Sequence, residues 1–187
     1  MNKTLSLIAI LFATVATSFA GEMTSSKKTV MPADDCRFRA QEWQVDMSTV
    51  GTLTTYGGQN REGLGGNLGI NYFFSKYFGV GVDNSVGSER NQGMTGFSGL
   101  QAFDSVQADL IARYPICAWN LAPYAMLGGG ASWGGTGSQG DGNVGGGLEY
   151  RVTRNVGMFV DCRWLYGNNG SKSLSQAMPR VGLRFAF

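Results

Sequence analysis

The stretch Arg180-Val181-Gly182-Leu183-Arg184-Phe185-Ala186-Phe187 alternates apolar residues with charged or small ones. Strict alternation predicts a β-strand whose two faces meet different surroundings, because successive side chains point to opposite sides of a strand. An uncovered apolar strand aggregates, so this one must close a barrel or be covered. One face holds Val181, Leu183, Phe185 and Phe187, and the other holds Arg180, Gly182, Arg184 and Ala186.

Composition narrows the range of functions. The chain has 187 residues, which suggests one domain, and a net charge of +2. Its 15 basic residues are scattered, so no nucleic-acid partner is expected. The 29 glycines and the low charged fraction of 15% are typical of sheets that bend and pack closely. Histidine is absent, which removes the commonest general base and most zinc sites, so we expect no enzyme, metal or cofactor.

The N-terminal stretch MNKTLSLIAILFATVATSFA, residues 1–20, has the pattern of a secretory signal peptide. A small-x-small site ends at Ala20, so cleavage is expected between Ala20 and Gly21. The alternative is a membrane anchor, which the short apolar region disfavours. Residues 21–40 are polar and predict a poorly ordered periplasmic leader. No later apolar run approaches the roughly 18 residues of a spanning helix, so any membrane must be crossed by strands.

Seven further segments alternate like the terminal one and predict antiparallel strands of about ten residues, the length of a tilted transmembrane strand. The expected connections alternate between long and short. This pattern predicts an all-β, eight-stranded antiparallel up-and-down transmembrane β-barrel over residues 41–187, with both termini in the periplasm. The phase of the strand at 122–134 stays open between Tyr124/Met126 and Leu127/Ala131/Trp133. The expected connections are 54–62, 75–77, 88–103, 115–121, 136–142, 153–155 and 167–177.

The faces opposite the apolar ones carry matched charges. An eight-stranded barrel is just wide enough inside to be filled by side chains, and an unpaired charge there costs several kcal/mol. Arginine suits pairing because its planar guanidinium engages two carboxylates. We therefore expect a salt-bridged, plugged interior rather than an ion path lined by charges. The network comprises Asp46, Asp83, Asp109, Glu149 and Asp161 with Arg113, Arg151, Arg163, Arg180 and Arg184.

Four stretches together resemble the small outer-membrane β-barrel family, which includes the OmpX-like and OmpA-like eight-stranded barrels. They are INYFFSKYFGVGVDNS, LAPYAMLGGG, MFVDCRWLYG and VGLRFAF, and the resemblance covers about residues 40–187. It implies that Val181, Leu183, Phe185 and Phe187 form the C-terminal signal read by the barrel-assembly machinery. Asp161 and Arg163 match the inward acid and base that the family carries two positions apart. The chain ends where some members add a peptidoglycan-binding domain, so it resembles the barrel-only members.

Three cysteines and one loop remain. Cys36 in the leader and Cys117 in a turn are expected on the same side of the membrane, so a disulfide between them is a hypothesis. Cys162 is expected on the lipid face. In loop 88–103, Met94, Phe97, Leu100 and Phe103 either contact an extracellular partner or lipopolysaccharide, or fold back on the barrel rim.

These observations predict a non-enzymatic protein of the bacterial outer membrane, in contact with membrane lipid and lipopolysaccharide. Its role would be structural or surface interaction, such as adhesion or envelope integrity. One alternative is a narrow channel. A less favoured alternative is a soluble lipocalin-like barrel that binds a small ligand, which would turn its apolar faces inward.

Overall fold

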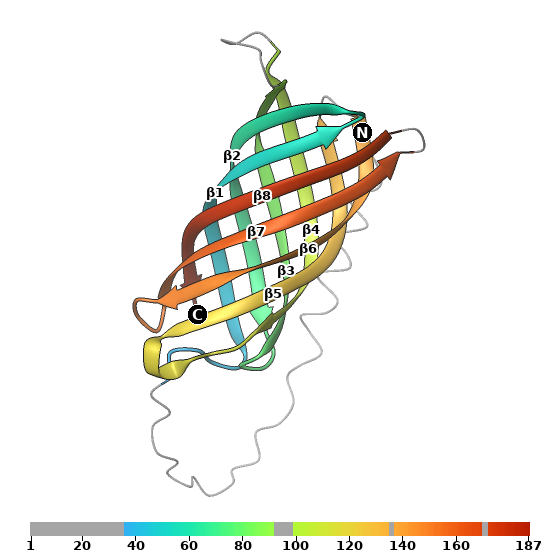
Figure 1. The fold of residues 1–187 in the computed structure, drawn as a ribbon. Coiled ribbons are helices and arrows are strands. Elements are labelled where there is room, and N and C mark those ends of the chain that lie inside the picture. The colour runs from blue at the N-terminus through green and yellow to red at the C-terminus, as the bar shows by residue number, and fades with distance from the viewer. Residues whose placement is uncertain (1–35, 92–98, 135–136, 170–171) are drawn as a thin grey trace, which may run out of the picture. The chain divides into compact units, whose positions relative to one another are not determined.

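The structure is a computed structural model that describes residues 36–187 except 92–98, 135–136 and 170–171 (Figure 1). The signal peptide with its cleavage site, and residues 21–35 of the leader, lie outside the described residues. Eight strands account for most of the rest, and each is antiparallel to its neighbours in sequence. They are β1 (Glu42–Tyr56), β2 (Gln59–Phe73), β3 (Phe78–Asn91), β4 (Gln101–Arg113), β5 (Leu121–Gly134), β6 (Gly137–Arg151), β7 (Val156–Asn169) and β8 (Lys172–Ala186).

The sheet closes into a barrel because β8 pairs with β1 as well as with β7. Val45 lies opposite Phe185 and Asp46 opposite Arg184, so the terminal strand that alternates most strictly also closes the sheet. Closure leaves no unpaired edge strand, as the apolar alternation requires. The predicted fold class, an eight-stranded antiparallel barrel, is confirmed.

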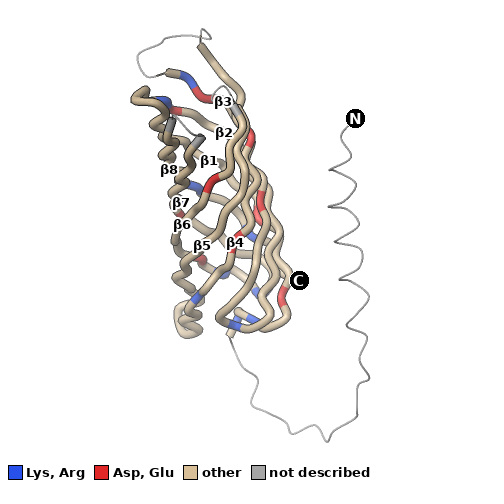
Figure 2. Tube along the Cα trace, turned by 90° about the vertical axis from the view of Figure 1, so that its right-hand side faces the viewer, with Lys and Arg blue, Asp and Glu red and all other residues tan. Residues whose placement is uncertain are grey.

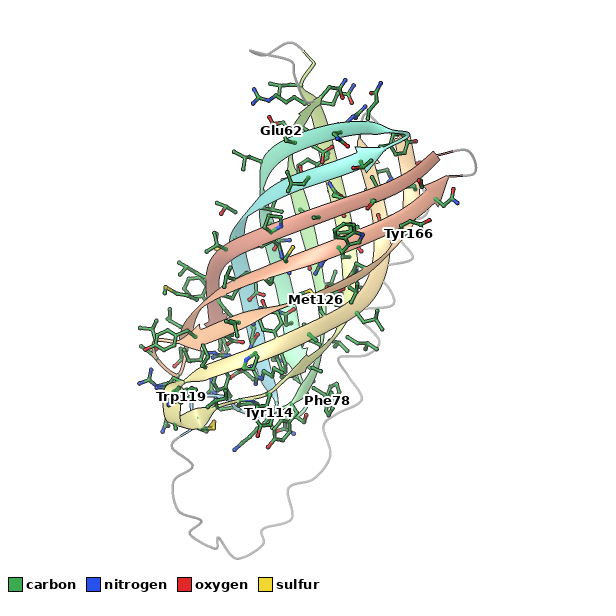
Figure 3. The ribbon with its side chains drawn as sticks, in the orientation of Figure 1. Glu62, Phe78, Tyr114, Trp119, Met126 and Tyr166 are labelled. Carbon is green, nitrogen blue, oxygen red and sulfur yellow. A yellow bond between two sulfur atoms is a disulfide. The ribbon has the colours of Figure 1, made fainter. Side chains whose placement is uncertain are left out.

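Apolar side chains point outward and charged side chains inward along the same strands. Val181 and Leu183 are 59% and 45% exposed, whereas Arg180 and Arg184 are 7% and 4% exposed. Figure 3 shows aromatic residues such as Phe78 and Tyr114 on the outside, near one end of the barrel. A barrel with this polarity turns its apolar face toward its surroundings and its polar face toward the lumen.

The open phase of β5 is resolved by its neighbours. Tyr124 and Met126 are buried in the interior, where they pack with Phe73 and Ile111, and Leu127 and Trp133 point outward. Gly128 lies opposite the inward Asp109, so the inward phase continues through the glycines.

The strands are longer and several connections shorter than predicted. They contain 13 to 15 residues rather than about ten. The expected loop 54–62 is mostly strand, with Thr54 opposite Arg61, and only Gly57-Gly58 connects β1 to β2. The expected long connections 136–142 and 167–177 are likewise mostly paired residues of β6, β7 and β8. These segments are polar on both faces, so pairing continues while the apolar alternation ends.

The two ends of the barrel differ. The end that carries Phe187, here called the Phe187 end, also holds the connections 74–77, 114–120 and 152–155 (Figure 1). The second of these includes η1 (Cys117–Trp119), a single 3-10 turn. The opposite end, called the Gly57 end, carries the β1–β2 turn. In the part of the chain that the structure describes, no helix is long and apolar enough to cross a membrane.

Candidate functional site

Charged residues occur at several levels along the strands between the two ends of the barrel (Figure 2), and many of them are buried in the lumen. All five predicted arginines are buried there, contributed by β4, β6, β7 and β8. The five predicted acids are buried in the same lumen. The ten residues separate into two clusters, which differ in position along the barrel axis and in charge balance.

The first cluster, called the Glu42 cluster, fills the Phe187 end. Arg184 binds Asp46 through two parallel hydrogen bonds of 2.7 and 2.6 Å and reaches Glu149 at 2.6 Å. Arg151 donates to Glu42 at 2.6 Å and also to Glu149. Arg113 donates to the same Glu42 oxygen at 3.1 Å. Three arginines and three carboxylates therefore balance within this cluster.

The second cluster, called the Asp83 cluster, lies farther along the axis. Arg163 binds Asp83 at 3.0 and 2.6 Å and also bonds Asp109. Arg180 binds Asp161 at 2.7 and 3.0 Å and reaches Asp83 at 3.3 Å. Two arginines here meet three carboxylates, and the hydroxyl of Tyr124 donates to Asp161 at 2.6 Å.

Aromatic rings complete the packing of the guanidinium groups. The guanidinium carbon of Arg113 lies 3.7 Å from the ring centroid of Phe73, and that of Arg184 lies 4.8 Å from the ring of Phe159. Such contacts stabilise a desolvated cation by about 2 kcal/mol. Small residues supply the space: a Cβ on Gly147 would lie 2.4 Å from the Cβ of Asp161. The inward glycines therefore allow charged side chains to fit a narrow lumen.

The pairing within the network differs from the family pattern in one respect. Asp161 and Arg163 both point inward from β7, but they do not bond to each other. Asp161 pairs with Arg180 of β8, and Arg163 pairs with Asp83 of β3 across the lumen. Arg151 and Glu149 have the same spacing on β6 and do bond to each other, so a separation of two residues does not by itself decide the partner.

Three further acids lie in the interior that were not among the predicted ten residues. Glu42 lies at the start of β1, and Glu89 and Asp141 fall in the expected connections 88–103 and 136–142, yet all three are buried. Each continues the inward phase of its strand, Glu42 two residues before Gln44 and Asp141 two residues before Asn143. The continued alternation of inward and outward residues could have identified these three acids. It was overlooked because Glu89 and Asp141 fall in segments that were expected to be loops.

Glu89 and Asp141 lie on the Gly57 side of the Asp83 cluster and have only neutral hydrogen-bond partners among the described side chains. Glu89 accepts hydrogen bonds from Thr54 and Gln176, both at 2.8 Å. Asp141 accepts from Gln107 at 2.6 Å and from Ser132. A cavity of about 20 Å³ lined by Glu89 and Ser132 lies in this region, which is room for about one water molecule. Two buried acids with neutral partners therefore line this part of the lumen.

The remaining predicted residues are located as follows. Cys36 and Cys117 form a disulfide, with Cα atoms 4.8 Å apart, and Cys162 is free and exposed on the outer face of β7. Leu100 is exposed, whereas Met94 and Phe97 lie outside the described residues. Phe103 is not on an exposed loop: it points inward from β4 and packs with Val50, Leu165 and Met178. The prediction for Phe103 was wrong because β4 begins two residues before it, at Gln101.

The four residues of the predicted C-terminal signal lie on the outside of β8 or just after it. Val181, Leu183 and Phe187 are exposed, and Phe185 is half-buried. The backbone of Phe187 pairs with that of Trp43 through hydrogen bonds of 3.3 and 2.9 Å, so the chain end is held against β1. Among the described residues, no group of three or more histidines, cysteines, aspartates or glutamates is arranged to hold a metal ion.

Comparison with known proteins gives structural relatives only. No protein-family model and no curated protein matches the chain. Among solved structures, Neisserial surface protein A (NspA) superposes with a TM-score of 0.66 at 16% identity, covering 78% of this chain and 97% of that one. Ail, the attachment invasion locus protein of Yersinia pestis, gives 0.53 at 19% identity, with coverages of 78% and 99%. The outer membrane protein OprG of Pseudomonas aeruginosa gives 0.54 at 10% identity, with coverages of 81% and 99%. The chain therefore has the fold of the small eight-stranded outer-membrane β-barrels.

Proposed function

We propose that the protein is a non-enzymatic outer-membrane barrel whose interior is sealed by its arginine–carboxylate network. The observation that carries this proposal is the polarity of the strands, with apolar side chains outside and paired charges inside. A soluble lipocalin-like barrel requires the reverse polarity. Floating the membranes of expressing cells on a density gradient tests the location. Protein that fractionates with outer membranes and needs detergent for extraction supports the proposal, and protein released in the periplasmic fraction contradicts it.

We infer that the Phe187 end faces the periplasm and the Gly57 end the exterior. The disulfide at the Phe187 end suits an oxidising periplasm. The terminal strand on this side also carries the signal that the assembly machinery would read. Protease added to intact cells tests this orientation: an epitope inserted at Gly57-Gly58 should be removed, and one inserted at 153–155 should survive. The opposite result reverses the orientation.

The role that we propose is surface interaction through the Gly57 end. One structural relative is named a surface protein and another an attachment protein, and Ail has been crystallised with the heparin analogue sucrose octasulfate. In this chain, Arg90 lies on the outward face of β3 near the Gly57 end and bonds Glu62, whereas the half-buried Arg61 continues the inward phase of β2 at the rim and bonds Gln101. We propose that these arginines exchange such partners for a sulfated or phosphorylated glycan, since guanidinium groups bind such anions well.

Immobilised heparin tests this role with purified protein in nanodiscs. Retention that falls when Arg61 and Arg90 are both changed to glutamine supports it, and Arg154→Gln, at the Phe187 end, is the matched control. The proposal is contradicted if the parent protein, the double variant and Arg154→Gln are retained equally, or if the parent protein is not retained at all.

A narrow cation channel is the second candidate, because Glu89 and Asp141 make the lumen acidic near the Gly57 end. The Asp83 and Glu42 clusters oppose conduction, because side chains paired across the lumen occupy its bore. Single-channel recording in planar bilayers separates the two functions. The sealed barrel gives no discrete openings, whereas reproducible, cation-selective steps would favour the channel.

A further inference from the structure

The short segment before β1 folds back against the mouth of the barrel at the Phe187 end (Figure 1, blue). Phe38, at its centre, has no exposed surface and packs with Cys36 and with Ala122 of β5. The guanidinium carbons of Arg113 and Arg151 lie 5.2 and 5.3 Å from the centre of its ring. Phe38 therefore covers the two arginines of the Glu42 cluster that lie nearest this mouth.

Polar contacts hold the backbone on either side of Phe38. Arg37 donates to the carbonyl oxygens of Arg151 and Val152, both at 2.6 Å. Arg113 donates to the carbonyl oxygen of Arg39 at 3.0 Å. Gln41 then adopts a φ of 56°, in the left-handed region, where the chain bends and enters β1. Arg39 also donates to Glu42 at 3.5 Å, so residues 36–41 fit the mouth through one aromatic side chain and four hydrogen bonds.

The disulfide fixes the other end of the segment. Cys36 is bonded to Cys117 in η1, between β4 and β5, while residue 41 leads directly into β1. The six residues are therefore tied to opposite parts of the rim. The arginines beneath do not depend on them, because Arg113 and Arg151 keep Glu42 as a partner and Arg151 also keeps Glu149.

We propose that residues 36–41 are a plug that the Cys36–Cys117 disulfide keeps seated in the Phe187 end of the barrel. A dithiol reductant supplies two electrons and two protons, the S–S bond breaks to give two thiols, and the dithiol becomes a disulfide. One buried aromatic ring is a small anchor against the conformational freedom that the segment regains. Reduction therefore releases Phe38 and opens this mouth to solvent, while the barrel beneath stays folded. The mouth at the Phe187 end is therefore closed when the disulfide is formed and open when it is reduced.

Trypsin cleavage after Arg37 and Arg39 reports whether the plug is seated, because a protease cuts backbone that has left its packed position. The full chain, purified in detergent micelles, is digested with and without dithiothreitol, and the products are identified by mass. We expect cleavage after Arg39 to be roughly tenfold faster after reduction, in proportion to the released population. The double variant Cys36→Ser/Cys117→Ser should be cut at the fast rate in both conditions.

Three comparisons make the result decisive. Cys162→Ser, which removes the free cysteine on the outer face, should behave as the parent protein does. Phe38→Ala should be cut faster even with the disulfide intact, and an unchanged rate would mean that Phe38 does not seat the plug. Circular dichroism of the reduced protein should keep its β signal, which separates plug release from unfolding. Equal cleavage rates for the oxidised and reduced protein overturn the proposal, whether both are slow or both are fast.

Discussion

Each buried arginine in the lumen bonds to at least two other residues. Arg163 bridges Asp83 and Asp109, and Arg180 bridges Asp83 and Asp161. Because a guanidinium group stays charged under all ordinary conditions, loss of one arginine leaves buried carboxylates without compensation. The network is therefore expected to be sensitive to the loss of single members.

Arg163→Met tests this sensitivity at one residue. Removing the guanidinium while keeping an unbranched side chain should lower the free energy of unfolding by about 3–5 kcal/mol. Urea unfolding in lipid vesicles, followed by tryptophan fluorescence, measures the change. Arg154→Met, in the exposed connection between β6 and β7, is the control and should change stability by less than about 0.5 kcal/mol. A loss below about 1 kcal/mol for Arg163→Met would mean that the network does not hold the barrel together.

At the scale of single strands, each β-strand has an apolar-faced part and a polar part. On β7 the outward residues pass from Met158 and Val160 to Asn168. The apolar-faced part of most strands was predictable from the sequence, and the predicted strands ended where apolar alternation stopped. Backbone pairing does not need that alternation, which explains why the eight strands and their faces were predictable but their Gly57 ends were not. Glu89 and Asp141 were missed for the same reason.

Two substitutions on β7 test where the apolar environment ends. Val160→Arg should destabilise the barrel by about 2–4 kcal/mol, since a charge near the bilayer centre loses its hydration. Asn168→Arg, on the same outward face, should cost at most about 1 kcal/mol. Unfolding in vesicles of defined thickness measures both. Similar losses at the two positions would contradict the assignment of a polar, membrane-distal part to this strand.

The two-residue turn between β1 and β2 was also missed, because a long polar loop was expected there. Gly58 has a φ of 81°, which side chains rarely tolerate, and no atom lies within 4 Å of a Cβ built on it. Gly58→Ala should therefore destabilise through backbone strain alone, by about 1–2 kcal/mol. Gly66→Ala is the matched control, since its Cβ would meet only one atom, at 3.9 Å. If thermal unfolding of the two variants is indistinguishable, the tight turn is not formed.

For the whole molecule, the outward face decides what surrounds the barrel. The large apolar side chains of the strands face outward, and the inward arginines have carboxylate partners in the lumen. This division was predictable because side-chain alternation with a period of two identifies both faces at once. The cross-lumen pairing was not, because partners such as Arg163 and Asp83 are 80 residues apart in sequence. Arg163 and Asp83 meet only because the sheet closes into a barrel and its strands pair in one particular register.

The free cysteine offers the most direct measurement of what the outward face contacts. Cys162 lies on that face of β7, and the other two cysteines are joined, so a nitroxide label attaches there without any substitution. In lipid vesicles, the label should collide often with oxygen, which concentrates among acyl chains, and rarely with a water-soluble nickel complex. The reference is a variant that combines Cys162→Ser with Thr153→Cys, so that the label sits in the water-exposed connection before β7. If the nickel complex reaches the label on Cys162 as readily as it reaches residue 153, the outward face is in water and the account of a membrane-embedded barrel is wrong.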